Sequence, residues 1–280
     1  MKRVFIHLYL LLLLFSNLLG LTVPKGFTRI ECKLKPVLRD SSVYPKRSTH
    51  PHIPHPSKAS GTSTNWSGYV AATSLTSPLT GSVSEVSGTW TTPTLTSVNN
   101  DTDYCAVWVG IDGWNSNSVE QLGTESDWFN GAQYNYAWVE MYPQASMIIS
   151  GFPVSPGDSI SASVQYIGCG IYLMNISNNT QKVYTVIPTQ NTISTSALRV
   201  SAEWIVEAPY SGGILPLANF GTINFSGCNT VINGTAGTIN NSAWVNDALT
   251  MVNGSTGALE SVPSALSTDG TSFSVTWKSE

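Results

Sequence analysis

The sequence predicts an all-β protein. Beyond residue 60 the chain is rich in Ser, Thr, Val, Gly, Tyr and Trp, and Gly, Pro or Asn interrupts it about every ten residues. This part shows no apolar repeat at the helical spacing. Short strands separated by turns are typical of an antiparallel β-sandwich or barrel. Residues 61–280 are long enough for one well-buried core, so we predict a single domain there.

Residues 1–20 have the pattern of a secretory signal peptide. Lys2 and Arg3 precede a run of apolar residues in MKRVFIHLYLLLLLFSNLLG. An uncleaved membrane anchor is the alternative, but the apolar run is short for a span. No later segment is apolar enough to cross a bilayer. We therefore predict a secreted protein without stable membrane association after processing.

Residues 21–60 are predicted to be a propeptide or linker. They are basic and rich in Pro and His, as in PKRSTHPHIPHPSK, and show no sustained hydrophobic period. They contain eight of the 13 Lys and Arg residues of the chain. Such a segment suggests an intramolecular electrostatic partner of an acidic domain, released on acidification.

The domain at residues 61–280 is strongly acidic. It holds only three of the 13 Lys and Arg residues but 15 of the 17 Asp and Glu residues, a formal charge of −12. This imbalance causes self-repulsion at neutral pH that is relieved as carboxylates protonate, so an acidic environment suits the domain. Secreted proteins that are merely soluble also carry such charge. The surface disfavours nucleic acid as a partner.

The position of the histidines excludes several mechanisms. All four precede residue 61, so Ser-His-Asp, Cys-His and HExxH zinc chemistry are not available in the domain. Cys105, Cys169 and Cys228 lack the spacing of a zinc site. Two of these cysteines could form a disulfide, or all three could be small buried hydrophobes. We predict neither a metal nor a cofactor.

The chain contains several Asn-x-Ser/Thr sequons, the acceptor sites for N-glycosylation, which fit an exported glycoprotein. A chain this rich in Asn, Ser and Thr also contains many of them by chance. They begin at Asn65, Asn100, Asn175, Asn178, Asn224, Asn233, Asn240 and Asn253.

Residues 104–113 are expected to form a strand with two unlike faces. Alternate residues from Cys105 to Ile111 are apolar and would face the core. The other face carries Tyr104, Ala106, Trp108, Gly110 and Asp112.

Two further segments show the same alternation. Residues 119–125 place Gln121 and Glu125 on one face of a strand. Residues 132–143 place aromatic residues and one acid on a single face: Tyr134, Tyr136, Trp138, Glu140 and Tyr142.

Residues 201–207, SAEWIVE, place two carboxylates inside an apolar strand of a chain that is only 11% charged. Glu203 and Glu207 share a face with Ile205. If the four segments are neighbours in one sheet, one face packs into the core and the other presents aromatics, carboxylates and an amide. That mixture suggests the floor of a cleft that binds an extended polymer. An ordinary sandwich with aromatics in the core and acids at strand ends is the alternative.

Seven short motifs in register resemble those of the glutamic peptidases, also called eqolisins. They are STNWSGYV (63–70), VSGTWTTP (86–93), AVWVGIDG (106–113), EQLGTE (120–125), YAWVEMYP (136–143), GDSISASV (157–164) and SAEWIVE (201–207). The resemblance fades toward the carboxyl end. It implies a secreted, acid-acting endopeptidase, made as a proprotein and monomeric, with polypeptide substrates. It also implies a concanavalin-like jelly roll of two antiparallel sheets, one bent into a substrate cleft.

The resemblance assigns the catalytic pair. The glutamine of the family falls on Gln121 in EQLG, and its glutamate falls on Glu207, the second acid of SAEWIVE. Glu203 matches the first acid, which does not carry the chemistry. Leu122 stands where Thr commonly follows the catalytic Gln, and Glu125 stands where Asp is usual. The remaining matches to positions that line or support the cleft are Trp108, Asp112, Trp138 and Glu140.

A Gln/Glu pair has the groups needed to hydrolyse an amide without a metal or a covalent intermediate. Ionised Glu207 can deprotonate water and then protonate the leaving nitrogen. Gln121 offers N–H donors to the oxyanion and a carbonyl that orients the water.

Two alternatives use the same face. A glycoside hydrolase would use two of Glu140, Glu203 and Glu207, with Trp108 and Trp138 stacking on sugars, and it leaves Gln121 without a role. A non-catalytic module that binds polysaccharide or a cell surface would need no propeptide.

Overall fold

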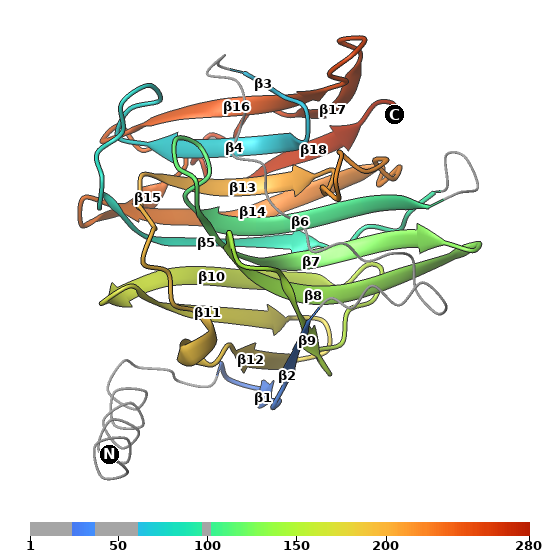
Figure 1. Cartoon of the computed structure of the whole chain (residues 1–280), viewed down its shortest axis with the longest axis horizontal. Helices are drawn as coiled ribbons and strands as arrows, with labels where there is room; N and C mark the ends of the chain where they lie inside the picture. Colours follow the sequence, from blue (N-terminus) through green and yellow to red (C-terminus); the bar gives the residue numbers. More distant parts are fainter. Residues whose placement is uncertain (1–23, 37–60, 97–101) are drawn as a thin grey trace.

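The computed structural model describes residues 24–36, 61–96 and 102–280. Within these ranges it contains 18 β-strands and one 3₁₀-helix, Thr189–Asn191 (Figure 1). The all-β prediction is confirmed. No helix within these ranges has the length and hydropathy needed to span a bilayer. The predicted signal peptide, together with residues 21–23 and 37–60 of the predicted propeptide, lies outside the described residues.

One sheet, called the first sheet, holds all four segments analysed above as direct neighbours. Every pairing in it is antiparallel. Its order is β16 (Val245–Val252), β4 (Trp66–Ala72), β13 (Ser201–Glu207), β6 (Asp103–Ile111), β7 (Val119–Phe129), β8 (Ala132–Tyr142), β9 (Met147–Ser150) and β2 (Lys33–Pro36).

The second sheet packs against the first. Its order is β1 (Thr28–Arg29), β12 (Val183–Val186), β11 (Ile171–Asn178), β10 (Ser159–Gly168), β5 (Val83–Thr91), β14 (Thr222–Ile232), β18 (Phe273–Trp277) and β17 (Leu259–Pro263). Strand β15 (Thr235–Thr238) pairs with β14, and β3 (Thr62–Ser63) pairs with β16. Strand β16 also pairs with β17, so the two sheets are joined along this strand. The residues after 210 complete the sandwich, as predicted.

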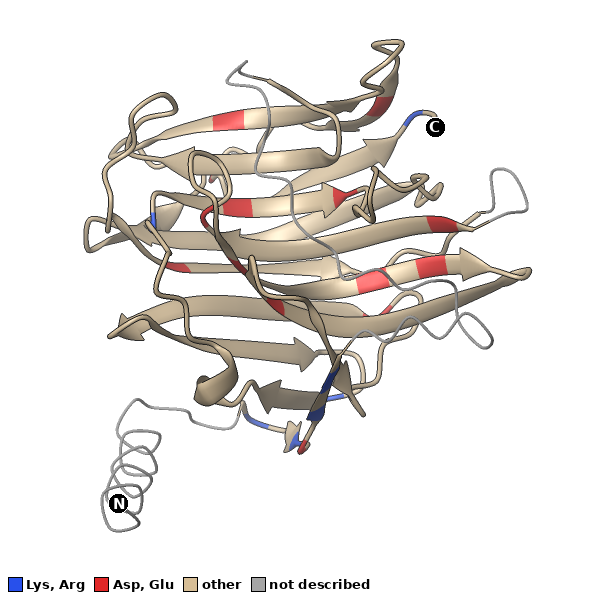
Figure 2. Ribbon diagram, viewed as in Figure 1, with Lys and Arg blue, Asp and Glu red and all other residues tan. Residues whose placement is uncertain are grey.

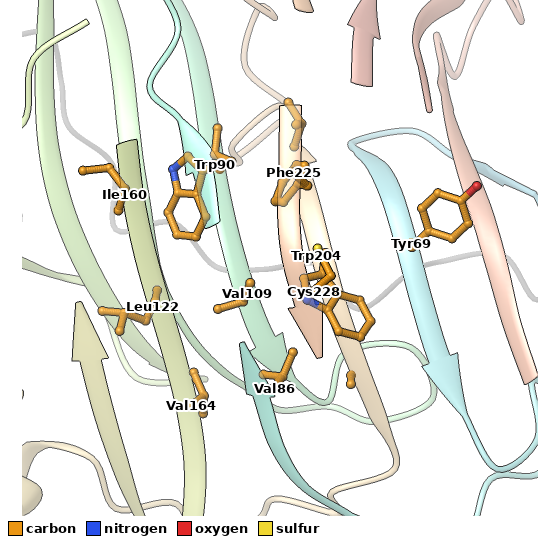
Figure 3. Packing of buried hydrophobic residues seen from close by; sticks show 14 of the residues in the cluster. Tyr69, Val86, Trp90, Val109, Leu122, Ile160, Val164, Trp204, Phe225 and Cys228 are labelled. Atoms are coloured by element: carbon orange, nitrogen blue, oxygen red, sulfur yellow. The ribbon is translucent and has the colours of Figure 1, made fainter. Parts of the chain in front are cut away.

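The main core lies between the sheets (Figure 3). The predicted core face of β6 is confirmed, since Val107 and Val109 are both buried there. Trp204 of β13 lies in the same core and donates its Nε1–H to the carbonyl of Ser87 on β5 at 2.8 Å. From the second sheet, Trp90 donates its Nε1–H to Thr124 Oγ1 of β7 at 2.9 Å. These crossed bonds satisfy the buried indole N–H groups and connect the layers.

The opposite face of the first sheet carries a second apolar cluster. Its buried members are Trp66, Val70, Ala106, Trp108, Trp114, Val119, Tyr136, Trp138, Ile205 and Leu249. This is the face that the sequence assigned to aromatics and acids, and Figure 2 shows Asp and Glu on several of its strands. We call it the site face.

All four cysteines carry free thiols. Cys105 and Cys228 are buried in the main core, as expected for small hydrophobes. Cys169 is exposed and Cys32 is partly buried. The alternative of a disulfide between two of the cysteines is therefore wrong for this structure.

Candidate active site

Strand register places Gln121 directly opposite Glu140. The two residues are partners in the antiparallel pair of β7 and β8, and both point to the site face. Gln121 Nε2 donates to Glu140 Oε2 at 2.7 Å. Gln121 Oε1 is buried and accepts no hydrogen bond from any described residue. A buried acceptor without a partner costs about 1–3 kcal/mol, so it indicates a functional role.

Neutral donors hold both oxygens of Glu207. Trp108 Nε1 donates to Glu207 Oε2 at 2.7 Å, and Asn65 Nδ2 donates to Oε1 at 3.3 Å. The backbone of Asn65 is fixed because its carbonyl accepts the N–H of Ala208 at 2.9 Å. These two donors orient the carboxylate and stabilise negative charge on it.

Two glycines make room for this arrangement. A Cβ on Gly123 would lie 2.6 Å from Trp108 Cβ and 2.3 Å from the carbonyl oxygen of Val107. A Cβ on Gly110 would lie 2.9 Å from the Trp108 ring and 3.1 Å from Gln121 Cβ. Glycine at both positions leaves room for the Trp108 side chain where it donates to Glu207.

The protonation of Glu140 differs from that of an ordinary surface acid. Burial raises its pKa well above its usual range, and the charge of Glu207 raises it further. The hydrogen bond from Gln121 opposes this shift and Glu125 adds to it. Glu140 is therefore a neutral acid in acidic solution.

The site face is closed to solvent in this chain. The exposed fraction is 0% for Gln121 and Trp108 and 2% for Glu207. Trp138 and Glu125 are also buried. The aromatics, amide and carboxyls are thus gathered as the sequence predicted, but they do not line an open cleft here.

The comparisons with known proteins give the family. The family model described as "Peptidase A4 family" matches residues 64–277. The chain belongs to the Peptidase A4 family. The resemblance to the glutamic peptidases is thereby confirmed.

Curated relatives support the same family. The chain is 30% identical to Aspergillopepsin-2 of Aspergillus niger over 127 residues, covering 44% of this chain and 45% of that protein. It is 33% identical to Scytalidopepsin B of Scytalidium lignicola over 135 residues, covering 45% of this chain and 51% of that protein. The matches span about half the length of these relatives.

Solved structures of this family share the fold. A scytalido-glutamic peptidase with a transition state analog inhibitor has a TM-score of 0.62 at 25% identity, covering 77% of this chain and 98% of that chain. Aspergilloglutamic peptidase from Aspergillus niger has a TM-score of 0.55 at 23% identity, covering 63% of this chain and 99% of that chain. The two-sheet sandwich predicted for this Peptidase A4 member is confirmed.

Two acids that the sequence linked to the site interact with a third, unpredicted acid. Asp112 accepts the backbone N–H groups of Arg199 and Val200, each at 2.8 Å. Burial raises its pKa, and these bonds offset part of that shift. Burial also raises the pKa values of Glu203 and Glu120 well above the usual range, and the charge of Asp112 adds to both shifts. We call Asp112, Glu120 and Glu203 the acid cluster.

Strand faces explain the remaining assignments. Glu120 points away from Gln121, its neighbour on β7, so the alternation that identified the site face passed over it. Leu122 also points away from the site and packs in the main core, so the departure from Thr at this position affects packing. The described residues contain no group of three or more His, Cys, Asp or Glu that could hold a metal ion.

Asn65 is a site residue that the sequence did not predict. The sequence marks it only as the start of an Asn-x-Ser/Thr sequon and as part of STNWSGYV. Its exposed fraction is 1%, so it is inaccessible to glycosylation in the folded chain. Its contact with Glu207 depends on the pairing of β4 with β13, which sets Trp66 opposite Glu207.

Proposed function

We propose that this chain is the precursor of a secreted, acid-acting endopeptidase in which Glu207 and Gln121 hydrolyse peptide bonds through an activated water. The observation that carries this proposal is that the site face holds both a carboxylate and an amide whose carbonyl oxygen has no partner among the described residues. Glu207 is held by two neutral donors, and Gln121 presents a buried carbonyl without a partner beside the neutral acid Glu140.

Each chemical step has a group in the structure suited to it. Glu207 takes a proton from water, and the resulting hydroxide attacks the peptide carbonyl. Gln121 Oε1 orients that water, because this oxygen has no described partner. The Gln121 amide has two N–H groups, and the one not bonded to Glu140 stabilises the oxyanion. Glu207 then gives the captured proton to the leaving nitrogen as the C–N bond breaks.

The other predicted residues support this pair. Trp108 orients Glu207, and Glu140 orients Gln121. Trp138 and Glu125 lie on the same face as this pair. There Trp138 would contact the substrate, and the charge of Glu125 adds to the raised pKa of Glu140. Asp112 and Glu203 act more remotely, through the acid cluster.

Burial of the pair supports the precursor part of the proposal. A polypeptide cannot reach Glu207 while its exposed fraction is 2%. We therefore assign residues 1–20 as a signal peptide and place activating cleavage within residues 21–60. A scytalido-glutamic peptidase that shares the fold and 25% of its sequence carries a transition state analog inhibitor, which supports a polypeptide substrate for this chain. The glycosidase alternative leaves Gln121 without a role, and the binding-module alternative needs no propeptide.

The test is cleavage of a denatured protein substrate from acid to neutral pH after acid incubation, with the new amino terminus identified. Wild type should cleave only in acid, Glu207→Gln should not cleave, and Gln121→Ala should be strongly impaired. Glu85→Gln is the matched control, because Glu85 lies on β5 in the second sheet. Full activity of Glu207→Gln after processing would show that Glu207 is not the base.

A further inference from the structure

Residues 24–36, which we call the clasp, lie outside the family match and yet belong to both sheets. Strand β1 pairs in parallel with β12 at the edge of the second sheet. Strand β2 pairs antiparallel with β9 at the edge of the first sheet. Figure 1 shows both short strands on the same side of the molecule, and Figure 2 shows the basic residues gathered there. The clasp therefore bridges the two sheets at one side of the sandwich.

Backbone pairing ties the clasp to each edge. Thr28 donates its N–H to the carbonyl of Lys182 at 2.8 Å, and Ile30 donates to the carbonyl of Tyr184 at 2.9 Å. On the first sheet the register runs from Lys33 opposite Ser150 through Pro36 opposite Met147. An extended peptide that adds a strand to a sheet edge gains its affinity from such bonds. It also covers edges that would otherwise be open to association.

Alternate side chains of the clasp point inward. Ile30, Cys32 and Leu34 are partly buried and pack against the main core. The residues that alternate with them are exposed: Glu31, Lys33 and Lys35. Burial raises the pKa of the Cys32 thiol, and a hydrogen bond with Thr185 offsets part of this shift. This alternation spans only three inward residues, too few to appear as a sustained period in the sequence.

Charge contributes little to these contacts. No ion pair joins Lys25, Arg29, Lys33 or Lys35 to any part of the chain that the structure describes. The one cationic contact comes from the domain side, where Lys182 Nζ lies 5.1 Å from the ring centre of Phe27. Backbone pairing and apolar packing do not titrate in the acid range, so acid alone should not release the clasp.

We propose that the edges of β9 and β12, with the core surface between them, form a docking surface that holds the clasp in trans. When the chain is cut between residues 37 and 60, residues 24–36 remain bound as a separate peptide. Processing in that interval then yields a two-chain protein. This differs from the electrostatic release that the charge of residues 21–60 suggests, and it does not rest on the proposed enzymatic function.

The experiment places a recognition sequence for a specific protease within residues 37–60 of the full chain. The chain carries Glu207→Gln to limit self-digestion, and mass spectrometry of an uncut sample verifies that the chain is intact before cutting. After cutting, gel filtration and mass spectrometry show whether the clasp peptide elutes with the domain. We expect co-elution at neutral pH and equally at acid pH. Separate elution at neutral pH, or release confined to acid pH, would overturn the proposal.

Paired variants identify the contacts responsible. Leu34→Asp places a charge against the core and should lose the peptide after cutting. Lys33→Thr combined with Lys35→Thr leaves the inward side chains intact and should retain it. Thermal unfolding of each uncut chain verifies the fold, and Leu34→Ala replaces Leu34→Asp if the latter does not fold, with partial loss expected. Release from the lysine variant together with retention by the Leu34 variant would show charge-based docking and contradict the proposal.

Discussion

The two faces of the first sheet are equally buried but opposite in chemistry. Along β13, Trp204 and Val206 lie in the main core, while Glu203 before them and Glu207 after them lie on the site face. A step of one residue along a strand changes the face, so one strand contributes to stability and to chemistry at once. The apolar face gains free energy from burial. The site face keeps polar groups buried at a cost, which is typical of a functional surface.

The largest expected effects are a loss of activity from a change on the site face and a loss of stability from a change in the main core. Glu207→Gln should lower kcat/KM by a factor of about 10²–10⁴, because it removes the proposed base. Its free energy of unfolding should stay close to wild type, since an amide keeps the shape of the side chain. Trp204→Ala should lower the free energy of unfolding by about 3–5 kcal/mol, because Trp204 is fully buried in the core.

Both variants are measured by urea unfolding and by steady-state cleavage after processing. If Glu207→Gln lost as much stability as Trp204→Ala, the site face would be a second structural core, and its carboxylates would need no catalytic explanation.

The acid cluster predicts the pH dependence of stability. The pKa values of Glu120, Glu203 and Asp112 are raised in the folded state, as is that of Glu140. Between the usual carboxyl pKa and these raised values the folded chain binds more protons than the unfolded chain. The free energy of unfolding should therefore fall as pH rises through that window, by at most about 1.4 kcal/mol per pH unit for each such group.

Urea unfolding at a series of pH values measures this slope. Glu203→Gln should flatten it, because the amide cannot titrate, whereas Glu85→Gln in the second sheet should leave it unchanged. A stability that rises from acid to neutral pH would contradict the assignment of protonated carboxyls.

Alternation along single strands was sufficient to predict the faces of β6, β7, β8 and β13. It succeeded because each strand contrasts apolar residues on one side with aromatic and acidic residues on the other. Alternation along one strand does not determine which distant strand it pairs with, or in which register. The approach of Asn65 to Glu207 arises from the register of β4 on β13, and the interaction of Glu120 with Asp112 arises at the end of β6.

The sequence also did not predict that the site face is buried or that the clasp pairs with both sheets. Both depend on how the whole chain folds over its own sheets. The family resemblance assigned Gln121, Glu207 and Trp108 to the site, but it did not indicate Asn65, the other donor to Glu207.

Asn65→Ala is expected to have the smallest effect on activity, because it removes only one of the two donors to Glu207 described above. Removing one donor from Glu207 should lower kcat by about tenfold, equivalent to about 1.4 kcal/mol. KM should change little, because Asn65 contacts the carboxylate and is expected to act through it. Asn229→Ala is the matched control, since Asn229 is exposed on β14.

A merely structural role for Asn65 would lower stability and leave kcat of the folded enzyme unchanged. The bond from Trp108 at 2.7 Å remains in Asn65→Ala, so the carboxylate keeps one donor and some activity. Adding Trp108→Phe removes the second donor while keeping an aromatic ring on the site face. The double variant should therefore lose more than the sum of the two single losses, because Glu207 then has neither neutral donor to orient it.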